Sequence, residues 1–396
     1  MTGPGGKQAV VLSSGGADGA YAVGVMKALF SGQSPATGHL PLNPEVFTGS
    51  SIGAFNAAFI VSHPETDCAT TAARLEQVWL EELAENPPEN KNGAYRYRGD
   101  PSNLFDLQNM TSDPLHYWPH LFGDGAFLSY DLFKRVANFA NTGMSIDRRL
   151  FKMVNFSSVV SAEPLMHVIK RSIHLENIRR SNTALRIAAT NWDTGDLEIF
   201  SNGDLTEQLG PRIILASASL PGFLSPVEIN RAPYVDAAVL GYAKLGPAID
   251  AGADTLHLIY LDPDADDIPP EEIESTIDTL YRIFTITWAA RLKRSLKGLA
   301  RINRILKRLE EAARKAGLST DQGQTILDAL IAPTGKDRPV VKVTAHRYFP
   351  RRDFGSLGIF NLERKRIEEL LEQGFKDAVE HDCADRGCVF ADGSGA

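Results

Sequence analysis

The sequence predicts an α/β protein, a three-layer α/β/α sandwich with a mostly parallel central sheet and additional helices. Two observations near the start of the chain predict this fold. A short apolar run at residues 8–13 leads through a glycine-rich turn into an apolar helical pattern at residues 21–30. The same order then recurs, with a strand at residues 45–48 and an apolar helix at residues 54–61. Strands that alternate with helices in this way build a parallel sheet with helices on both faces.

The rest of the chain continues this alternation after an interruption. Residues 85–125 are rich in Pro, Asn, Asp and aromatic residues, which predicts an irregular insertion. We expect residues 1–265 to form the core, residues 266–320 an acidic linker and a basic helical insertion, and residues 321–390 a strand and a helix that complete the same domain. Further strands are expected at residues 158–161, 185–191, 197–200, 232–235, 255–261 and 340–344, and further helices at residues 210–218, after residue 236, at residues 288–309 and at residues 362–380.

The composition limits the class of protein. The chain has 396 residues, of which 43% are apolar and 23% charged, and its formal net charge is −8. These values indicate a soluble globular protein and exclude a disordered chain or a small disulfide-stabilised protein. The acidic balance argues against nucleic-acid binding, which needs a basic face. The three cysteines, Cys68, Cys383 and Cys388, do not have metal-ligand spacing, so we expect a reducing cytoplasmic environment, no metal and no cofactor.

No targeting or membrane-spanning segment is expected. The first seven residues are glycine-rich and lack the long apolar stretch of a signal peptide. Residues 46–64 form an uncharged run, but hydroxyl and amide side chains and two glycines interrupt it. A buried strand followed by a buried helix explains this run better than a membrane span. We therefore expect any membrane contact to be peripheral.

The strongest signal for chemistry is Gly49-Ser50-Ser51-Ile52-Gly53, a Gly-x-Ser-x-Gly sequence between the second strand and its helix. A nucleophilic serine on such an elbow needs neighbours without side chains, because the turn is strained and the backbone packs closely around it. The helix start also directs free N–H groups at developing negative charge. Ser51 is therefore the candidate nucleophile, and the alternative is a turn of small residues that only brings the helix close to the sheet.

A second glycine-rich turn follows the first strand, Ser14-Gly15-Gly16-Ala17-Asp18-Gly19. It is compatible with a dinucleotide-binding loop, with an oxyanion hole of free backbone amides, or with a plain turn. The neighbouring elbow favours the oxyanion hole, because a nucleotide site has no need of Ser51.

A serine nucleophile needs a base. None of the nine histidines lies in a turn that would direct it at a site, and His257 and His381 are expected to be structural; His116 and His120 in the insertion are harder to dismiss. Asp236 is the better candidate, since it ends an apolar strand and is followed by small residues. The alternative is an aspartate that merely caps a helix.

These residues resemble the patatin-like phospholipases, which hydrolyse acyl esters of lipids with a serine–aspartate dyad and no histidine. Residues 10–21 are similar to the glycine-rich oxyanion loop of that family, residues 49–53 to its nucleophile elbow and residues 236–238 to its aspartate motif, and residues 188–195 and 216–222 resemble stretches between them. The resemblance implies that Ser51 is the nucleophile, that Asp236 is the base, and that the amides of Gly15, Gly16 and Ala17 form the oxyanion hole. It also implies a lipid or other acyl-ester substrate.

The chain departs from the family pattern at four places, and one of them is residues 241–243, where Gly-Tyr-Ala stands instead of the Asn-x-Pro that often follows the aspartate. Ser14 replaces the first glycine of the oxyanion motif, Asp18 replaces a basic residue, and Ala237 replaces the glycine after the aspartate. An acid at position 18 removes a positive charge near the site and adds a negative one. The alternative to an active hydrolase is therefore a degenerate member that binds lipid or a partner without catalysis.

The charge is unevenly distributed along the chain. Residues 282–315 carry eleven Lys or Arg and two Glu, whereas residues 262–274 carry seven acids. Apolar residues recur at helical spacing in the basic segment: Trp288, Leu292, Leu296, Leu299, Ile302, Leu306 and Leu309. This pattern indicates either a helix docked on the core with a solvated basic face or a helix that makes peripheral contact with an anionic membrane.

Overall fold

The computed structural model describes residues 6–86, 91–97, 160–240, 245–261, 276–331, 341–350 and 358–395. Most of the predicted insertion, with His116 and His120, lies outside these residues, and so does the acidic stretch 262–274.

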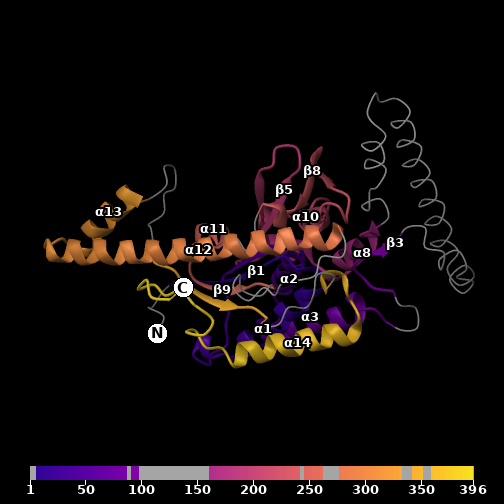
Figure 1. Ribbon diagram of the computed structural model, residues 1–396, viewed down its shortest axis with the longest axis horizontal. Coiled ribbons are helices and arrows are strands. Elements are labelled where there is room, and N and C mark those ends of the chain that lie inside the picture. Colours follow the sequence, from indigo (N-terminus) through magenta and orange to yellow (C-terminus); the bar gives the residue numbers. More distant parts are fainter. Residues whose placement is uncertain are drawn as a thin grey trace, which may run out of the picture.

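A central sheet of eight strands organises the described chain (Figure 1). Its order is β10-β9-β1-β2-β5-β8-β7, and β6 pairs with β5. The pairs from β10 to β5 are parallel, whereas β6 and β8 run antiparallel to β5 and β7 runs antiparallel to β8. The strands are β1 (Lys7–Leu12), β2 (Val46–Ser50), β5 (Ala184–Asn191), β6 (Leu197–Ser201), β7 (Val227–Ile229), β8 (Ala232–Asp236), β9 (Ala253–Ile259) and β10 (Thr344–Tyr348), and a separate pair is formed by β3 (Arg96–Tyr97) and β4 (Val160–Ser161).

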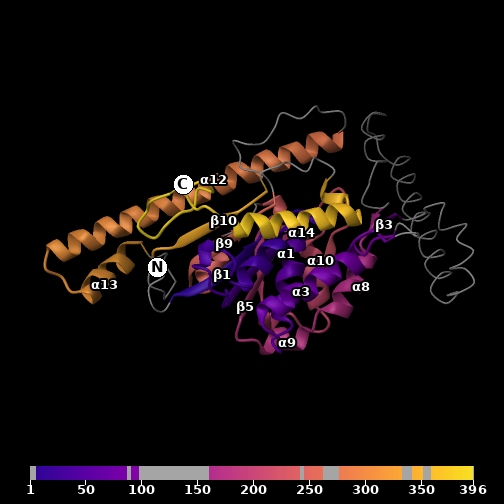
Figure 2. The ribbon, with the colours of Figure 1, turned by 90° about the horizontal axis from the view of Figure 1, so that it is seen from below.

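Helices cover both faces of this sheet, which confirms the predicted three-layer α/β/α class (Figures 1 and 2). On one face α1 packs against α14 and α3, and on the other face α11 and α12 pack against the strands. The helices are α1 (Gly19–Phe30), α2 (Ile52–Val61), α3 (Cys68–Val78), α8 (Glu163–Ser172), α9 (Leu175–Arg180), α10 (Gly210–Ser217), α11 (Gly246–Asp250), α12 (Thr276–Lys315), α13 (Thr320–Ile331) and α14 (Arg364–Val379). Short turns of helix are η1 (Gly16–Asp18), η2 (Pro35–Thr37), η3 (Trp79–Leu83), η5 (Asn202–Asp204), η6 (Ala237–Val239) and η7 (Gly358–Phe360).

Strand β1 shows why the sheet needs a cover on each side. Val10 and Leu12 belong to the core under α1 and α2, whereas Ala9 and Val11 belong to the core under α11 and α12. Successive side chains of a strand point to opposite faces, so a strand that is apolar at every position must be buried on both.

Helix α12 is docked on the sheet through the apolar stripe that the sequence predicted. Trp288, Leu292, Leu296 and Leu299 are buried against strand residues of the second core. The predicted stripe is wrong at Ile302, which is 43% exposed, while its neighbour Asn303 is fully buried. The helical repeat of 3.6 residues brings position 303 beneath position 299 and turns position 302 outward. No described helix combines the length and apolar character that crossing a membrane requires.

The last strand lies later in the chain than predicted. A strand was expected at residues 340–344, but β10 begins at Thr344. The backbone of Val343 instead bonds the Asn303 side chain, which accepts from the Val343 amide at 3.1 Å and donates to its carbonyl oxygen at 2.8 Å. Because its amide and carbonyl groups are hydrogen-bonded to the Asn303 side chain of α12, Val343 does not take part in the strand ladder.

Candidate active site

The sheet register brings the candidate residues together. Leu12 pairs with Gly49, Ser50 pairs with Ala188, and Ala189 pairs with Asp236. The residues that follow β1 and β2 and the last residue of β8 therefore meet beside the middle of β5. Positions far apart in the sequence converge because each lies at or just past the end of its strand.

Ser51 occupies a strained turn between β2 and α2. Its φ is 55° and its ψ is −132°, a conformation that side-chain-bearing residues rarely adopt. The amide of Ser51 donates to Ser217 Oγ at 2.9 Å, and that hydroxyl donates to the carbonyl oxygen of Ala188 at 2.7 Å. Ser217 of α10 therefore ties the elbow to β5 and holds the strained backbone in place.

The two glycines of the elbow are required by close backbone contacts. A Cβ on Gly49 would lie 2.4 Å from the carbonyl oxygen of Gly53, and a Cβ on Gly53 would lie 2.6 Å from the carbonyl oxygen of Ser13. Both distances are far below van der Waals contact. The Gly-x-Ser-x-Gly pattern thus has a steric reason, since α2 starts directly against the ends of β1 and β2.

Asp236 is 1% exposed, at the end of β8. Its Oδ1 accepts from the Ala238 amide at 2.8 Å and from Ser14 Oγ at 3.4 Å. Burial raises the pKa of Asp236 to about 6, and the neighbouring Ala238 amide and the Ser51 and Ser14 side chains partly oppose the rise. The sequence thus identified two side chains that the structure brings close together.

The glycine-rich turn after β1 presents backbone amides at the start of α1. Gly15 precedes η1, and Gly16 has a φ of 55°. A Cβ on Gly16 would lie 2.2 Å from the carbonyl oxygen of Ile359, so the turn is also closed from outside by η7. Among the described residues, no acceptor is hydrogen-bonded to the amides of Gly15, Gly16 or Ala17. These N–H groups are available to a negatively charged oxygen.

An ion pair with Arg366 compensates the negative charge of Asp18 in this turn. Its Oδ1 lies 2.8 Å from Nη2 of Arg366 on α14, and the Asp18 side chain is 7% exposed. A positive charge is therefore present beside the turn although the sequence motif lacks one. No local sequence signal connects Arg366 to Asp18, since the two are separated by almost the whole chain.

Two further residues of the site were not singled out from the sequence. Ser14, seen there only as a departure from a glycine, donates to Asp236 and to Ser50 Oγ at 3.1 Å. Ser217 lies in residues 216–222, one of the stretches that carry the family resemblance, and this resemblance is the sequence signal that could have identified it. The hydroxyl groups of Ser14 and Ser217 bond residues on other elements, and a sequence pattern does not show which elements are neighbours.

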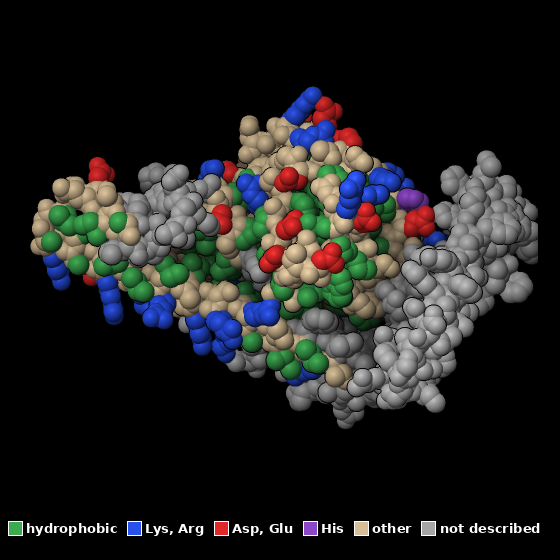
Figure 3. All heavy atoms as spheres, turned by 90° about the horizontal axis from the view of Figure 1, so that it is seen from above, with side chains coloured by type: hydrophobic (Ala, Val, Ile, Leu, Met, Phe, Trp, Pro, Cys, Tyr) green, Lys and Arg blue, Asp and Glu red, His purple; other side chains and the backbone are tan. Residues whose placement is uncertain are grey.

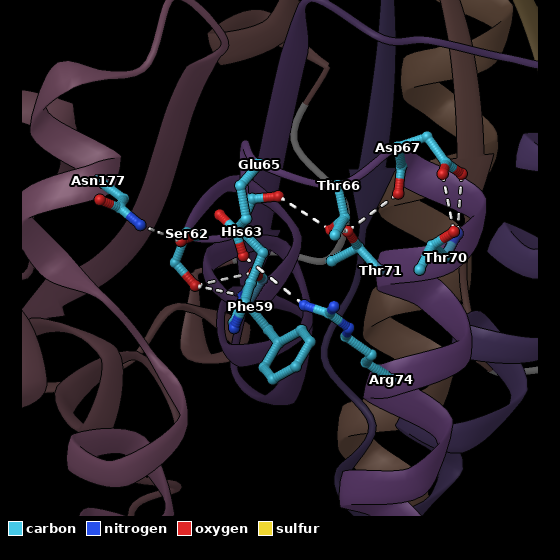
Figure 4. Close-up of polar contacts among 10 residues, drawn as sticks. All are labelled: Phe59, Ser62, His63, Glu65, Thr66, Asp67, Thr70, Thr71, Arg74 and Asn177. Atoms are coloured by element: carbon cyan, nitrogen blue, oxygen red, sulfur yellow. Dashed lines mark hydrogen bonds and ion pairs between the residues drawn. The ribbon is translucent and has the colours of Figure 1, made fainter.

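His63, His257 and His346 do not lie beside Ser51. His63 is at the far end of α2, about 15 Å of helix from Ser51. Its Nδ1 lies 2.9 Å from the carbonyl oxygen of Phe59 and 3.0 Å from Ser62 Oγ (Figure 4). His257 stacks on His346 on two strands at the other side of β1. In the described part of the chain, Ser51 is hydrogen-bonded through its amide to Ser217 and through its carbonyl oxygen to the Ala54 amide, and not to a histidine.

Comparison with known proteins points to one family. The family model described as Patatin-like phospholipase matches residues 10–248, more than half of the chain. Among solved structures, the chain is similar to VipD from Legionella pneumophila, with 13% sequence identity and a TM-score of 0.38. The match covers 96% of this chain and 66% of the VipD chain, so this chain spans just under two thirds of the length of VipD. A comparison with curated proteins gives no match.

Proposed function

Since this chain belongs to the patatin-like phospholipase family, we propose that it hydrolyses acyl esters of lipids, as a phospholipase A, a lysophospholipase or an esterase. Ser51 is the proposed nucleophile and Asp236 the proposed base. The observation that carries the proposal is that the Ser51 side chain lies close enough to the buried Asp236 carboxyl to lower its pKa. The proposed oxyanion hole is formed by the amides of Gly15, Gly16 and Ala17.

The proposed reaction has two halves. In the first, Ser51 Oγ attacks the ester carbonyl carbon while its proton passes to Asp236, and the carbonyl oxygen becomes an anion held by the turn amides. The tetrahedral intermediate collapses, and the alcohol leaves with the proton from Asp236. In the second half, water gives a proton to Asp236 and attacks the acyl group, which releases the fatty acid and returns the proton to Ser51.

The environment of Asp236 suits the role of base. A carboxylate with its usual pKa is a weak base near neutral pH, whereas the pKa of Asp236 is raised to about 6 by burial. The carboxylate remains the major form at pH 7. The hydrogen bonds from Ala238 and Ser14 fix one carboxylate oxygen and so orient the group toward Ser51.

An apolar wall next to the proposed oxyanion hole suits an acyl chain. The rings of Phe223 and Phe360 have centroids 4.5 Å apart, and Ile359 lies directly against Gly16. The Tyr95 hydroxyl donates to the Phe360 carbonyl oxygen at 2.7 Å and holds this segment. Aliphatic chains gain free energy by burial against such side chains.

Hydrolysis of a short-chain nitrophenyl ester tests the dyad. Ser51→Ala and Asp236→Asn should each abolish turnover while the circular dichroism spectrum stays that of the folded protein. Ser62→Ala is the control, because it removes a buried hydroxyl at the opposite end of α2. A fluorophosphonate probe should label the wild type and not Ser51→Ala. If the folded wild type neither reacts with the probe nor hydrolyses any ester, the degenerate lipid- or partner-binding alternative is favoured.

We also propose that α12 makes peripheral contact with anionic membranes, through its outer face rather than through its buried stripe. Figure 3 shows a row of Lys and Arg side chains along the edge of the molecule on which α12 runs. The exposed residues of this face recur at helical spacing: Ile283, Ile286, Arg294, Lys297, Arg301, Ile305 and Arg308. Such a mixture of exposed isoleucines and cations suits the headgroup region of an anionic bilayer.

Vesicle sedimentation at low salt tests this contact. Replacing Arg294, Lys297 and Arg301 together by Glu should abolish binding to phosphatidylglycerol vesicles. The control replaces three exposed bases on other helices, namely Lys170, Arg180 and Lys365, and should retain binding. Absence of wild-type binding at low salt would retire the proposal.

A further inference from the structure

Two histidines and two cysteines come together where the C-terminal segment meets the last strand of the sheet. We call them the edge cluster: His346, His381, Cys383 and Cys388. His346 lies on β10, His381 follows α14, and the two cysteines lie in the segment after it. Each side chain offers one ligand atom, and these four atoms all lie within 4.8 Å of one another.

The geometry points to a metal site, and we propose that the edge cluster binds one zinc ion. Cys383 Sγ lies 3.4 Å from His346 Nδ1 and 3.4 Å from His381 Nε2, and Cys388 Sγ lies 3.5 Å from the same His381 nitrogen. Zinc holds sulfur at about 2.3 Å and imidazole nitrogen at about 2.1 Å in a tetrahedron, which places neighbouring S and N ligands about 3.6 Å apart. These three pairs of atoms already have nearly the separation of the edges of such a tetrahedron.

The donor set selects zinc among the common divalent metals. Two thiolates and two neutral imidazoles form a closed tetrahedral site for a borderline-soft ion, whereas magnesium and calcium require oxygen ligands. All four positions are filled by the protein, so the site has no open position for a substrate. This arrangement is typical of structural zinc.

The surroundings of the edge cluster fit thiolates bound to a cation. Cys388 is fully buried, and its sulfur accepts from the Arg347 amide at 3.4 Å. His381 is 5% exposed, and its other ring nitrogen has no hydrogen-bond partner among the described residues, so its polar contacts there are with the two sulfurs. Cys383 and Cys388 are not joined as a disulfide.

The ion would fasten the end of the chain to the sheet. The C-terminal segment already pairs with β10, because the amides and carbonyls of Ala345 and Val389 bond each other at 2.7 and 3.0 Å. Between the two cysteines, Arg386 donates to the Phe349 carbonyl oxygen at 2.6 Å and pairs with Asp377 of α14 at 3.0 Å. A metal at the edge cluster adds a link between α14, this segment and β10.

This role is separate from that of the proposed active site. Strand β10 is three strands from β2 in the sheet, a distance of about 14 Å. Loss of the metal should therefore act on the stability of the C-terminal segment and not on the chemistry of Ser51. The spacing of the cysteines alone does not predict this site, because the four ligands come from two segments and only His381, Cys383 and Cys388 are near one another in the sequence.

Metal analysis of protein purified without a histidine tag tests the proposal. The wild type should contain one zinc per chain, and Cys383→Ser and Cys388→Ser should each lose it. Two controls should keep it: Cys68→Ser, which changes the cysteine outside the cluster, and His167→Asn, which changes an exposed histidine. If the serine variants fail to fold, cobalt titration of the chelator-treated wild type decides the question, because two thiolates and two imidazoles around Co²⁺ give tetrahedral d–d bands and a sulfur-to-metal charge-transfer band.

Stability gives a second readout that is independent of ester hydrolysis. A chelator should lower the melting temperature of the wild type and of Cys68→Ser, and zinc should restore it. A wild type that holds no zinc above the buffer background and gives no cobalt spectrum would overturn the proposal. So would a Cys383–Cys388 disulfide in protein prepared without oxidant, because that bond removes both thiolates.

Discussion

The guanidinium of Arg366 pairs with the carboxylate of Asp18 at 2.8 Å, which joins α14 to the turn that starts α1. Both side chains are largely buried, at 15% and 7% exposure. The last long helix of the chain therefore supplies the positive charge beside the glycine-rich turn. The turn that bears the proposed oxyanion hole is complete only when α14 is docked.

Arg366→Gln should destabilise the protein by about 3 kcal/mol, because it removes the guanidinium that lies 2.8 Å from the buried Asp18 carboxylate. The double variant with Asp18→Asn should recover a large part of that loss. Urea unfolding of the two single variants and the double variant measures the coupling. Lys365→Gln is the matched control on the same helix, where an exposed pair with Glu369 at 3.9 Å should contribute less than about 1 kcal/mol. Additive effects of the two substitutions would contradict a direct interaction.

Asp236→Asn should make the protein more stable at pH 8 while it abolishes turnover. The pKa of Asp236 is raised from 3.8 to about 6, so between these values the native state binds the proton more strongly than the unfolded chain does. The stabilising contribution of the protonated group is present below pH 3.8 and is lost as the pH rises through about 6. A shift of this size corresponds to about 3 kcal/mol, which the amide variant should gain as an upper limit at pH 8.

Urea unfolding of this variant and the wild type from pH 4 to pH 8 checks the sign. The difference in unfolding free energy should be smallest at pH 4 and grow toward pH 8. Asp193→Asn changes an exposed aspartate and serves as the control. A gain in stability that is greatest at low pH would show that burial does not disfavour the charged form of Asp236.

Turnover should depend on one deprotonation near pH 6. The proposed base is active as the carboxylate, so kcat/KM for a neutral ester should rise with pH and level off above about 7. The fitted pKa reports the free enzyme. An inflection near 3.8 would mean that burial does not perturb this carboxyl, and an inflection near 8 would indicate that another group limits the reaction.

Gly53→Ala should destabilise the protein by about 1–3 kcal/mol and reduce turnover, because its Cβ would lie 2.6 Å from the Ser13 carbonyl oxygen and 2.8 Å from that of Leu12. The displaced elbow would move Ser51 away from Asp236. Gly298→Ala is the contrasting variant, since nothing lies within 4 Å of its Cβ position and it is within α12. There alanine should stabilise the helix by about 0.5–1 kcal/mol. Equal stability of the two variants would contradict the steric account of the elbow.

The order of strands and helices and the elbow could be predicted from the sequence, because both depend on local patterns. Apolar runs of strand length followed by glycine turns and apolar helices specify the βα units, and the flanking glycines of Ser51 indicate a turn without room for side chains. Asp236 could be nominated because it ends an apolar strand. The proximity of Ser51 to Asp236, the raised pKa of Asp236 and the hydrogen bonds of Ser14 and Ser217 required the sheet register.

Helix α12 has a sequence pattern that predicts an amphipathic helix but does not specify what its apolar face contacts. Its apolar spacing established an amphipathic helix, but the same spacing suits a protein core and a membrane surface. Only the packing decided that Trp288 and Leu292 face the sheet and that Asn303, not Ile302, is buried between α12 and Val343.

The sequence by itself therefore determined the fold class, the elbow at Ser51 and the candidate base Asp236, since these follow from residue types at short spacing. The tertiary structure decided which residues far apart in the sequence lie together: Arg366 pairs with Asp18, and His346 lies beside the cysteines of the edge cluster. Charge pairing and metal ligation depend on distances of a few ångströms between side chains, and such distances arise only when separate elements pack together.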